Sequence, residues 1–102
     1  MTLGSTGLKV LVTDSVHPIL ISGLQSRGLT VDYLPDITLE EVKARIHLYS
    51  GLIINTKIRV DREMLQFAGK LRVVGRLGSG KEILDLGALA GKGVSVITTP
   101  EA

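Results

Sequence analysis

The 102-residue sequence contains no cysteine, few aromatic residues and no long apolar run. Without cysteine the chain can form neither a disulfide nor a thiolate metal site, which fits a reducing compartment such as the cytoplasm. No stretch approaches the roughly 18 consecutive apolar residues of a membrane span. The formal net charge is only +2 and aromatics make up 3% of the residues, so basic patches and base-stacking platforms are missing. We therefore expect neither a nucleic-acid partner nor a membrane partner.

What the sequence does contain is typical of a single globular domain. Hydrophobic residues make up 44% of the chain, and with so few aromatics the core must be built from Leu, Ile and Val. Residues 1–7 are rich in Gly, Ser and Thr and lack the basic and apolar regions of a signal peptide. We expect a flexible leader over residues 1–7 and one domain over residues 8–102.

Five short apolar runs alternate with four segments that carry helix signals. We expect strands at residues 9–13, 29–34, 51–55, 71–75 and 94–98. Asp14 and Ser15 are expected to cap the first helix, with Pro18 in its first turn. Thr38–Glu41 is a capping box for the second helix, and Asp61 is the expected cap of the third.

Strands joined by helical crossovers lie parallel, and parallel strands covered on both faces appear as apolar runs. The pattern predicts an α/β, flavodoxin-like five-stranded parallel sheet of order 2-1-3-4-5, with an incomplete Rossmann half as the alternative. In this order the first helix covers one face, with Ile19, Leu20 and Leu24 as its apolar stripe, and the other three cover the second face. The final helix that would join the first is missing, so we expect an uncovered apolar area and a homodimer formed through it.

Residues 71–86 come close to two nucleotide-binding motifs and complete neither. The spacing G-x-x-x-x-G-K over residues 75–81 is that of a P-loop, but Glu82 stands where Ser or Thr would hold magnesium. The glycines at 78 and 80 fit the start of the dinucleotide fingerprint, but Ile83 occupies the third glycine position. The default interpretation is a strand-to-helix turn whose glycines permit unusual backbone angles.

Several segments resemble a known family. Residues 9–14 with the helix that follows are similar to its opening βα unit, and residues 51–57 to its third strand and first substrate loop. Residues 76–85 and 93–102 resemble its second substrate loop and the strand that leads to its hinge. On these segments the chain resembles the amino-terminal part of the substrate domain of D-2-hydroxyacid dehydrogenases, of the D-3-phosphoglycerate dehydrogenase-like kind.

The resemblance implies a ligand site at the loops after the third and fourth strands. In the family, amides of the fourth-strand loop bind the substrate carboxylate, and a glycine turn before a helix offers such donors. The first loop often supplies an Arg in phosphoglycerate-type members, whereas this chain has Asn55, which cannot make a charged two-pronged contact. Lys81 and Ile83 also depart from the family pattern. The implied substrate-binding residues, vestigial here, are Asn55, Thr56, Lys57, Arg76, Gly78, Ser79 and Gly80.

The resemblance also implies that NAD and the catalytic Arg, Glu and His belong to a nucleotide domain outside this sequence. No catalytic, cofactor-binding or metal-ligating residue is therefore expected here, and His17 and His47 are interpreted as a helix cap and a helix-surface residue. We expect a substrate-domain fragment that is inactive alone. A small binding module, with a weak carboxylate or phosphate site at residues 77–82, is the alternative. An enzyme completed by a second chain is a third hypothesis.

Overall fold

A computed structural model describes residues 8–55, 58–77 and 84–99. Within this part of the chain five parallel strands form one sheet of order β2-β1-β3-β4-β5. The strands are β1 (Lys9–Val12), β2 (Thr30–Tyr33), β3 (Gly51–Ile54), β4 (Val73–Leu77) and β5 (Ser95–Thr99). The helices are α1 (Pro18–Ser26), α2 (Leu39–Arg45), α3 (Arg62–Leu65) and α4 (Leu86–Gly91), and a 3₁₀-helix, η1 (Ile46–Leu48), continues α2. The predicted flavodoxin-like order is confirmed.

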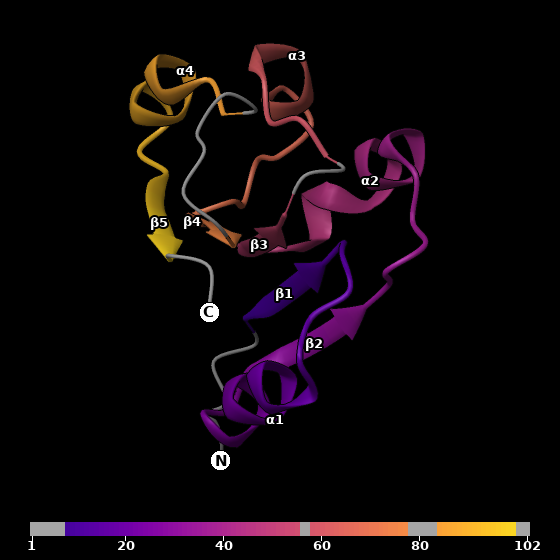
Figure 1. Cartoon of the computed structure of the whole chain (residues 1–102). Helices are drawn as coiled ribbons and strands as arrows, with labels where there is room; N and C mark the ends of the chain where they lie inside the picture. Colours follow the sequence, from indigo (N-terminus) through magenta and orange to yellow (C-terminus); the bar gives the residue numbers. More distant parts are fainter. Residues whose placement is uncertain (1–7, 56–57, 78–83, 100–102) are drawn as a thin grey trace.

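The helices divide unequally between the two faces of the sheet. Figure 1 shows α2, α3 and α4 on one side of the sheet and α1 on the other, beside β1 and β2. This is the division that the sequence predicts. Among the described residues, no helix qualifies as a membrane-spanning segment.

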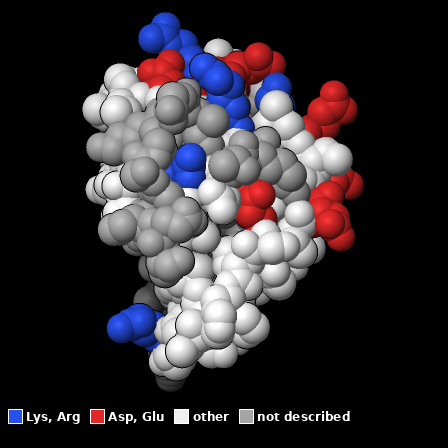
Figure 2. All heavy atoms as spheres, viewed as in Figure 1, with Lys and Arg blue, Asp and Glu red and all other residues white. Residues whose placement is uncertain are grey.

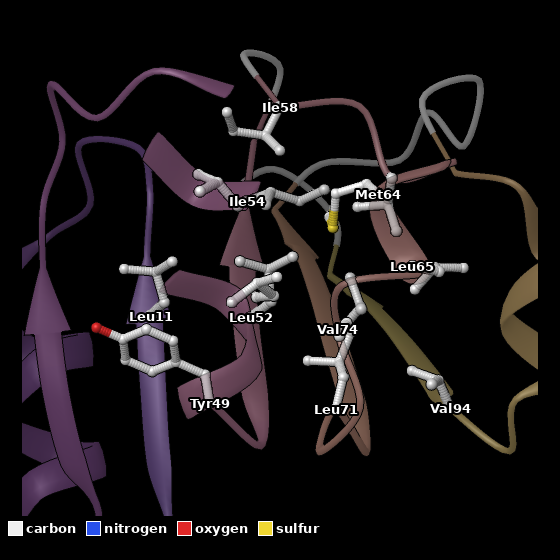
Figure 3. Packing of buried hydrophobic residues seen from close by; sticks show 14 of the residues in the cluster. Leu11, Tyr49, Leu52, Ile54, Ile58, Met64, Leu65, Leu71, Val74 and Val94 are labelled. Atoms are coloured by element: carbon white, nitrogen blue, oxygen red, sulfur yellow. The ribbon is translucent and has the colours of Figure 1, made fainter. Parts of the chain in front are cut away.

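The core lies between the sheet and the three-helix layer. Alternate residues of the central strands point to this side, and Leu11, Leu52 and Val74 are almost completely buried. The same cluster contains Val42 of α2, Met64 of α3 and Leu89 of α4, together with Tyr49 beyond η1. Figure 3 shows these aliphatic side chains closely packed, with Tyr49 the one aromatic ring among those labelled. The core is aliphatic, as the composition predicts.

The opposite face is only partly covered. Val12, Ile53, Gly75 and Ile97 are register partners across four strands and form one row on this face. Val12 is fully buried at the α1 end of the row, whereas Ile97 at the far end is 56% exposed. Because the side chains of a strand alternate between the two faces, this whole row lies on the side away from the core. The apolar surface beyond α1 is therefore open within the described structure.

Helix α1 departs from the prediction in two ways. Its N-cap is His17, whose Nδ1 accepts from the Ile19 amide at 3.1 Å, so the expectation that Asp14 and Ser15 cap it is wrong. No residue of α1 is buried, and Ile19 of the predicted stripe is 72% exposed. A helix buries its stripe only against a neighbour, and α1 contacts mainly the edge strand β2. The predicted Pro18 first turn is confirmed.

The other predicted caps are confirmed. Thr38 and Glu41 form a reciprocal capping box at α2, and the Asp61 carboxylate accepts from the Met64 amide at 2.9 Å. Helix α3 is short. The spacing of Leu84, Leu86, Leu89 and Ala90 predicts that all four lie on the fourth helix, and this is wrong for Leu84, because α4 begins only after Asp85. Leu84 instead pairs with Val60 in an isolated parallel bridge. The fourth strand begins and ends two residues later than predicted, which places Arg76 inside β4.

Candidate ligand site at the carboxyl edge of the sheet

Three strand ends meet at one edge of the sheet. Asp14 follows β1, Asn55 follows β3, and Arg76 is the penultimate residue of β4. In open parallel sheets, ligands bind at the carboxyl ends of the strands, where the strand order reverses. Here the order reverses between β1 and β3, so Asp14 and Asn55 flank the reversal point.

Asp14 joins the ends of β1 and β3. Its Oδ2 accepts from the backbone amide of Asn55 at 2.7 Å. The preceding Thr13 is fully buried, and its amide donates to the Ile53 carbonyl at 3.1 Å, which extends the ladder by one bond. The Thr13 hydroxyl lies 3.4 Å from the same carbonyl and from Asp14 Oδ2. The backbone at Asn55 is thus fixed from the β1 side.

Arg76 joins the ends of β3 and β4. Its Nη1 donates to the Asn55 side-chain Oδ1 at 3.1 Å and also to the carbonyl of Leu77. Only 7% of Arg76 is exposed, and its Nε has no hydrogen-bond partner in the described part of the chain. The ion pair of Lys43 with Glu63 does not involve this guanidinium, and no ion pair between Arg76 and a described carboxylate is present. Burying a cation is costly unless it is paired and hydrogen-bonded, which makes the charge of Arg76 an important electrostatic feature of this edge.

The structure brings together two of the predicted site residues, Asn55 and Arg76. Thr56, Lys57, Gly78, Ser79 and Gly80 lie outside the described residues, as does the 77–82 loop beyond Leu77. The alternation of residues along a strand places Arg72 and Arg76 on one face, where each is expected to be solvated or paired. Arg76 is paired, through its hydrogen bonds to Asn55 and Leu77, and Arg72, which precedes β4, is exposed to solvent.

Asp14 is the residue that the sequence analysis assigned to the wrong role. A carboxylate shortly before a helix usually caps it. Here the chain continues to His17 before the helix begins, and Asp14 turns to the β3 end instead. Its position directly after Thr13, the last residue of the predicted strand, was the available signal.

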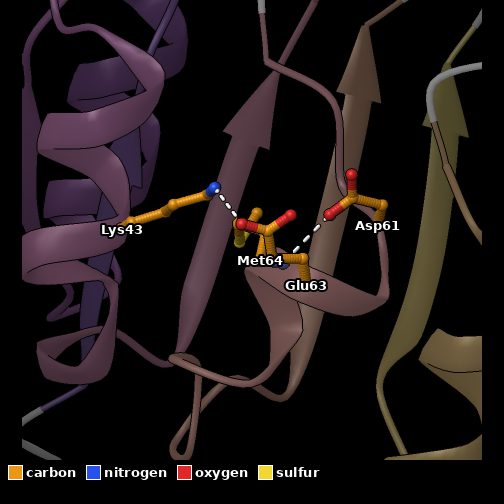
Figure 4. Close-up of polar contacts among 4 residues, drawn as sticks. All are labelled: Lys43, Asp61, Glu63 and Met64. Carbon is orange, nitrogen blue, oxygen red and sulfur yellow. Dashed lines mark hydrogen bonds and ion pairs between the residues drawn. The ribbon is translucent and has the colours of Figure 1, made fainter.

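Other polar contacts lie away from this edge. Figure 4 shows the Lys43–Glu63 ion pair between α2 and α3, with an Nζ to Oε2 distance of 2.9 Å, and the Asp61 cap beside it. The hydrogen bond to Glu63 raises the pKa of Lys43 above its usual 10.5, and both side chains reach solvent. An open hollow of about 320 Å³ lies between β2 and α2, lined by Tyr33, Asp36, Arg45 and their neighbours.

A second polar cluster ties the edge strand β2 to the core. Tyr49, which is 1% exposed, donates its hydroxyl to Asp32 of β2. Burial, and then the neighbouring Asp32 carboxylate, raise the pKa of Tyr49 above the usual 10.0, while Arg45 acts in the opposite direction. The ammonium of Lys9 lies 5.4 Å from the centre of the Tyr49 ring. This cluster connects strands β1 and β2 to the segment that follows η1.

The described residues do not fit a dinucleotide or a metal ion. A dinucleotide requires glycines in the first strand-to-helix turn, where the backbone approaches the pyrophosphate. Residues 13–17 contain no glycine, and the amide of Ile19 at the start of α1 is already occupied by the His17 side chain. Across the described ranges no group of three His, Cys, Asp or Glu side chains could hold a metal. Gly75 of the P-loop-like spacing lies within β4, so no loop begins there.

These features define a class: an α/β domain with a flavodoxin-like sheet whose polar groups meet at the carboxyl edge. Residues 10–102 match the model of the D-isomer specific 2-hydroxyacid dehydrogenase catalytic domain. The chain therefore belongs to the D-isomer specific 2-hydroxyacid dehydrogenase family, and it corresponds to part of the catalytic domain. The family resemblance drawn from the sequence is confirmed.

Individual relatives agree with this assignment. D-3-phosphoglycerate dehydrogenase of Homo sapiens is 38% identical over 92 residues, which cover 90% of this chain and 17% of the human protein. The same enzyme of Methanocaldococcus jannaschii is 34% identical over 95 residues, 93% of this chain and 18% of that protein. The chain thus spans less than a fifth of the length of these relatives.

Solved structures show the same fold. A Thermus thermophilus protein superposes with a TM-score of 0.80 at 30% identity, covering 87% of this chain and 29% of that one. The NAD⁺-bound 3-phosphoglycerate dehydrogenase of Entamoeba histolytica superposes with a TM-score of 0.79 at 23% identity, covering 92% of this chain and 33% of that one.

Proposed function

We propose that this chain is the substrate-domain fragment of an NAD-dependent D-2-hydroxyacid dehydrogenase of the D-3-phosphoglycerate type, and that it is inactive alone. The observation that carries the proposal is the joined edge of Asp14, Asn55 and Arg76, in a chain that belongs to this family. The edge offers hydrogen-bond donors and one buried cation, which suit an anionic ligand. It offers no described base and no glycine turn for a dinucleotide, so binding and orientation are the tasks it can perform.

The test is to incubate the chain with D-3-phosphoglycerate and NAD⁺ and to measure the formation of NADH. We expect no turnover by the chain alone, and turnover by the purified chain would contradict the proposal. Adding a separately produced nucleotide domain of a related dehydrogenase tests whether a second chain can complete the enzyme. NADH formation that needs both chains would support the substrate-domain role and would favour the third hypothesis over an inert fragment.

The second candidate function is a small binding module with a weak carboxylate or phosphate site at residues 77–82. Arg76, buried at the start of this region with an unpartnered Nε, favours it. A titration with D-3-phosphoglycerate or sulfate, monitored through the backbone amide signals in NMR spectra, distinguishes the binding module from the inert fragment. Shifts confined to residues 77–82 would support the module, and no shifts would support the inert fragment.

We also propose that the isolated chain forms a homodimer through the partly covered sheet face. Ile97 is 56% exposed at the end of an apolar row, and Figure 2 shows little charge over α1 and β2 compared with the part of the surface over α2–α4. Light scattering on a sizing column, over a range of concentrations, measures the molar mass. Ile97→Lys should give a monomer, whereas Leu86→Lys, at a 45% exposed site on α4, should leave the dimer intact. A monomeric wild-type chain would refute this proposal.

A cytoplasmic location remains a prediction.

A further inference from the structure

Helix α1 depends more on its cap than the other described helices do. It has no buried residue, whereas α2, α3 and α4 each bury at least one. It spans nine residues, fewer than the roughly 12–15 that an isolated helix needs in water. Its first turn has no acidic residue and its last turn no basic one, so charged side chains in these turns do not complement the helix dipole. The hydrogen bonds at its start therefore matter for its stability.

The cap of α1 is a histidine in one particular protonation state. His17 Nδ1 accepts from the Ile19 amide at 3.1 Å, and the His17 carbonyl accepts from the Leu20 amide at 3.0 Å. Because an amide N–H can only donate, Nδ1 carries no proton and the imidazole is neutral, with its proton on Nε2. Serine, threonine and asparagine, which are common N-caps, accept through an oxygen that does not titrate near neutral pH. A histidine cap is instead an acceptor that one proton removes.

Protonation of His17 is unfavourable at this position for two reasons. Imidazole takes up its second proton within roughly pH 5–8, and both ring nitrogens are then donors. Nδ1–H would face the Ile19 N–H, so the capping bond is replaced by two opposed donors. The added positive charge would also lie at the positive end of the helix dipole. The capped start of α1 and the charged imidazole therefore exclude each other.

The neighbouring groups do not offset this conflict. Asp14, on the β1 side, uses its Oδ2 to accept from the Asn55 amide. Tyr33, from β2, accepts from the Val16 amide through its hydroxyl. Arg27 follows α1 at the opposite end of the helix. In the described part of the chain no ion pair joins His17 to a carboxylate, so the imidazolium has no partner there that would hold it in place.

We propose that His17 makes α1 an acid-sensitive helix: a proton on His17 removes the cap and unwinds the first turn, while the sheet stays folded. The core cluster contains no residue of α1, which is why the change stays local. Among the described helices, α1 alone lies on the partly covered face of the sheet (Figure 1). The protonation state of His17 therefore controls how well that face is covered near Val12. This device goes beyond the proposed function and does not require a ligand.

NMR spectra of the full wild-type chain, recorded from about pH 8 down to about pH 5, test the proposal. The ring signals of His17 and His47, the only two histidines, report their protonation. We expect the ¹³Cα shifts of residues 18–21 to move toward coil values in step with the His17 ring, while those of α2 stay helical. The equilibrium constant for forming the first turn should fall about fivefold, the usual effect of a lost N-cap. Helical shifts at residues 18–21 that persist after His17 is protonated would overturn the proposal.

Three variants assign the effect to the cap. His17→Asn keeps a side-chain acceptor that does not titrate, so α1 should stay helical at both ends of the pH range. His17→Ala has no acceptor, so the first turn should be partly unwound at both ends. His47→Asn, at the exposed histidine of η1, is the matched control and should respond to acid as the wild type does. An acid response that persists in His17→Asn, or a fully helical first turn in His17→Ala, would overturn the proposal.

Discussion

Tyr49 links the second polar cluster to the stability of the domain, and Tyr49→Phe tests that link. The substitution removes only the hydroxyl that donates to Asp32 and keeps the buried ring. Hydrogen bonds to charged groups contribute about 1.5–3 kcal/mol. Asp32 is half-buried, so water can hydrate its carboxylate after the change. We therefore expect a loss at the low end, about 1.5 kcal/mol of the free energy of unfolding.

The same contact predicts a pH dependence. The pKa of Tyr49 is raised above 10.0, chiefly by burial, so the folded state holds this proton more tightly than the unfolded chain. Its contribution to stability is complete below pH 10.0 and is lost as the pH rises through the raised value. The Tyr49→Phe variant has no hydroxyl to titrate at this position, so it does not undergo this loss of stability. The difference in unfolding free energy between the two proteins should therefore narrow above pH 10.0.

Urea denaturation of the wild type and the variant, at neutral pH and above pH 10.0, measures both effects. Comparing the two proteins cancels the alkaline titration of Lys43, which both share. Tyr33→Phe is the matched control, because the Tyr33 hydroxyl accepts only a 3.3 Å contact from the Val16 amide at an exposed site. The control should change stability by less than about 0.5 kcal/mol. A Tyr49→Phe difference that stays constant across the alkaline range would refute the reasoning.

Three further predictions concern stability and are checked by chemical denaturation at neutral pH. Gly75→Ala should stabilise the fold by about 0.5 kcal/mol, because the added Cβ would lie at an ordinary contact distance of 3.6 Å from the Ile53 side chain. Gly51→Ala should not stabilise it, because the added Cβ would lie only 3.1 Å from the Val10 side chain. Equal effects of the two substitutions would contradict this prediction. Thr38→Ala should cost about 1 kcal/mol through loss of the capping box, and a neutral result would count against it. Glu63→Gln should leave the denaturation midpoint almost unchanged, since a surface ion pair contributes little to stability, and a clear drop in the midpoint would contradict this.

The sheet could be predicted because each strand carries its own signal. Residues 51–54 are an unbroken apolar run, and the caps at Thr38 and Asp61 depend on contacts within one helical turn. The strand order followed from the regular alternation of these strands with helices, since helical crossovers join parallel strands. Local sequence therefore contained most of what was needed for the fold.

The contacts of the site could be predicted only in part, because they join residues far apart in sequence. Asp14 and the Asn55 amide are separated by 41 positions, and Arg76 and Asn55 by 21. Asp14 was assigned to the nearer helix because short-range capping is the commoner use of such a residue. The burial of Arg76 also depends on where β4 ends, and strand ends are the least certain part of a prediction.

The isolated bridge between Val60 and Leu84 has a consequence for how the site can change. The amide of Asp85 donates to the Val60 carbonyl at 2.8 Å, so the chain is anchored to the segment after β3 just before α4 begins. Leu77 ends β4 and Leu84 lies in the bridge, so both positions are fixed by backbone pairing and not by side-chain contacts. A frame held by backbone pairing tolerates changes of side chain, because its hydrogen bonds do not depend on residue type. This part of the fold is therefore a suitable place to insert or diversify a recognition sequence.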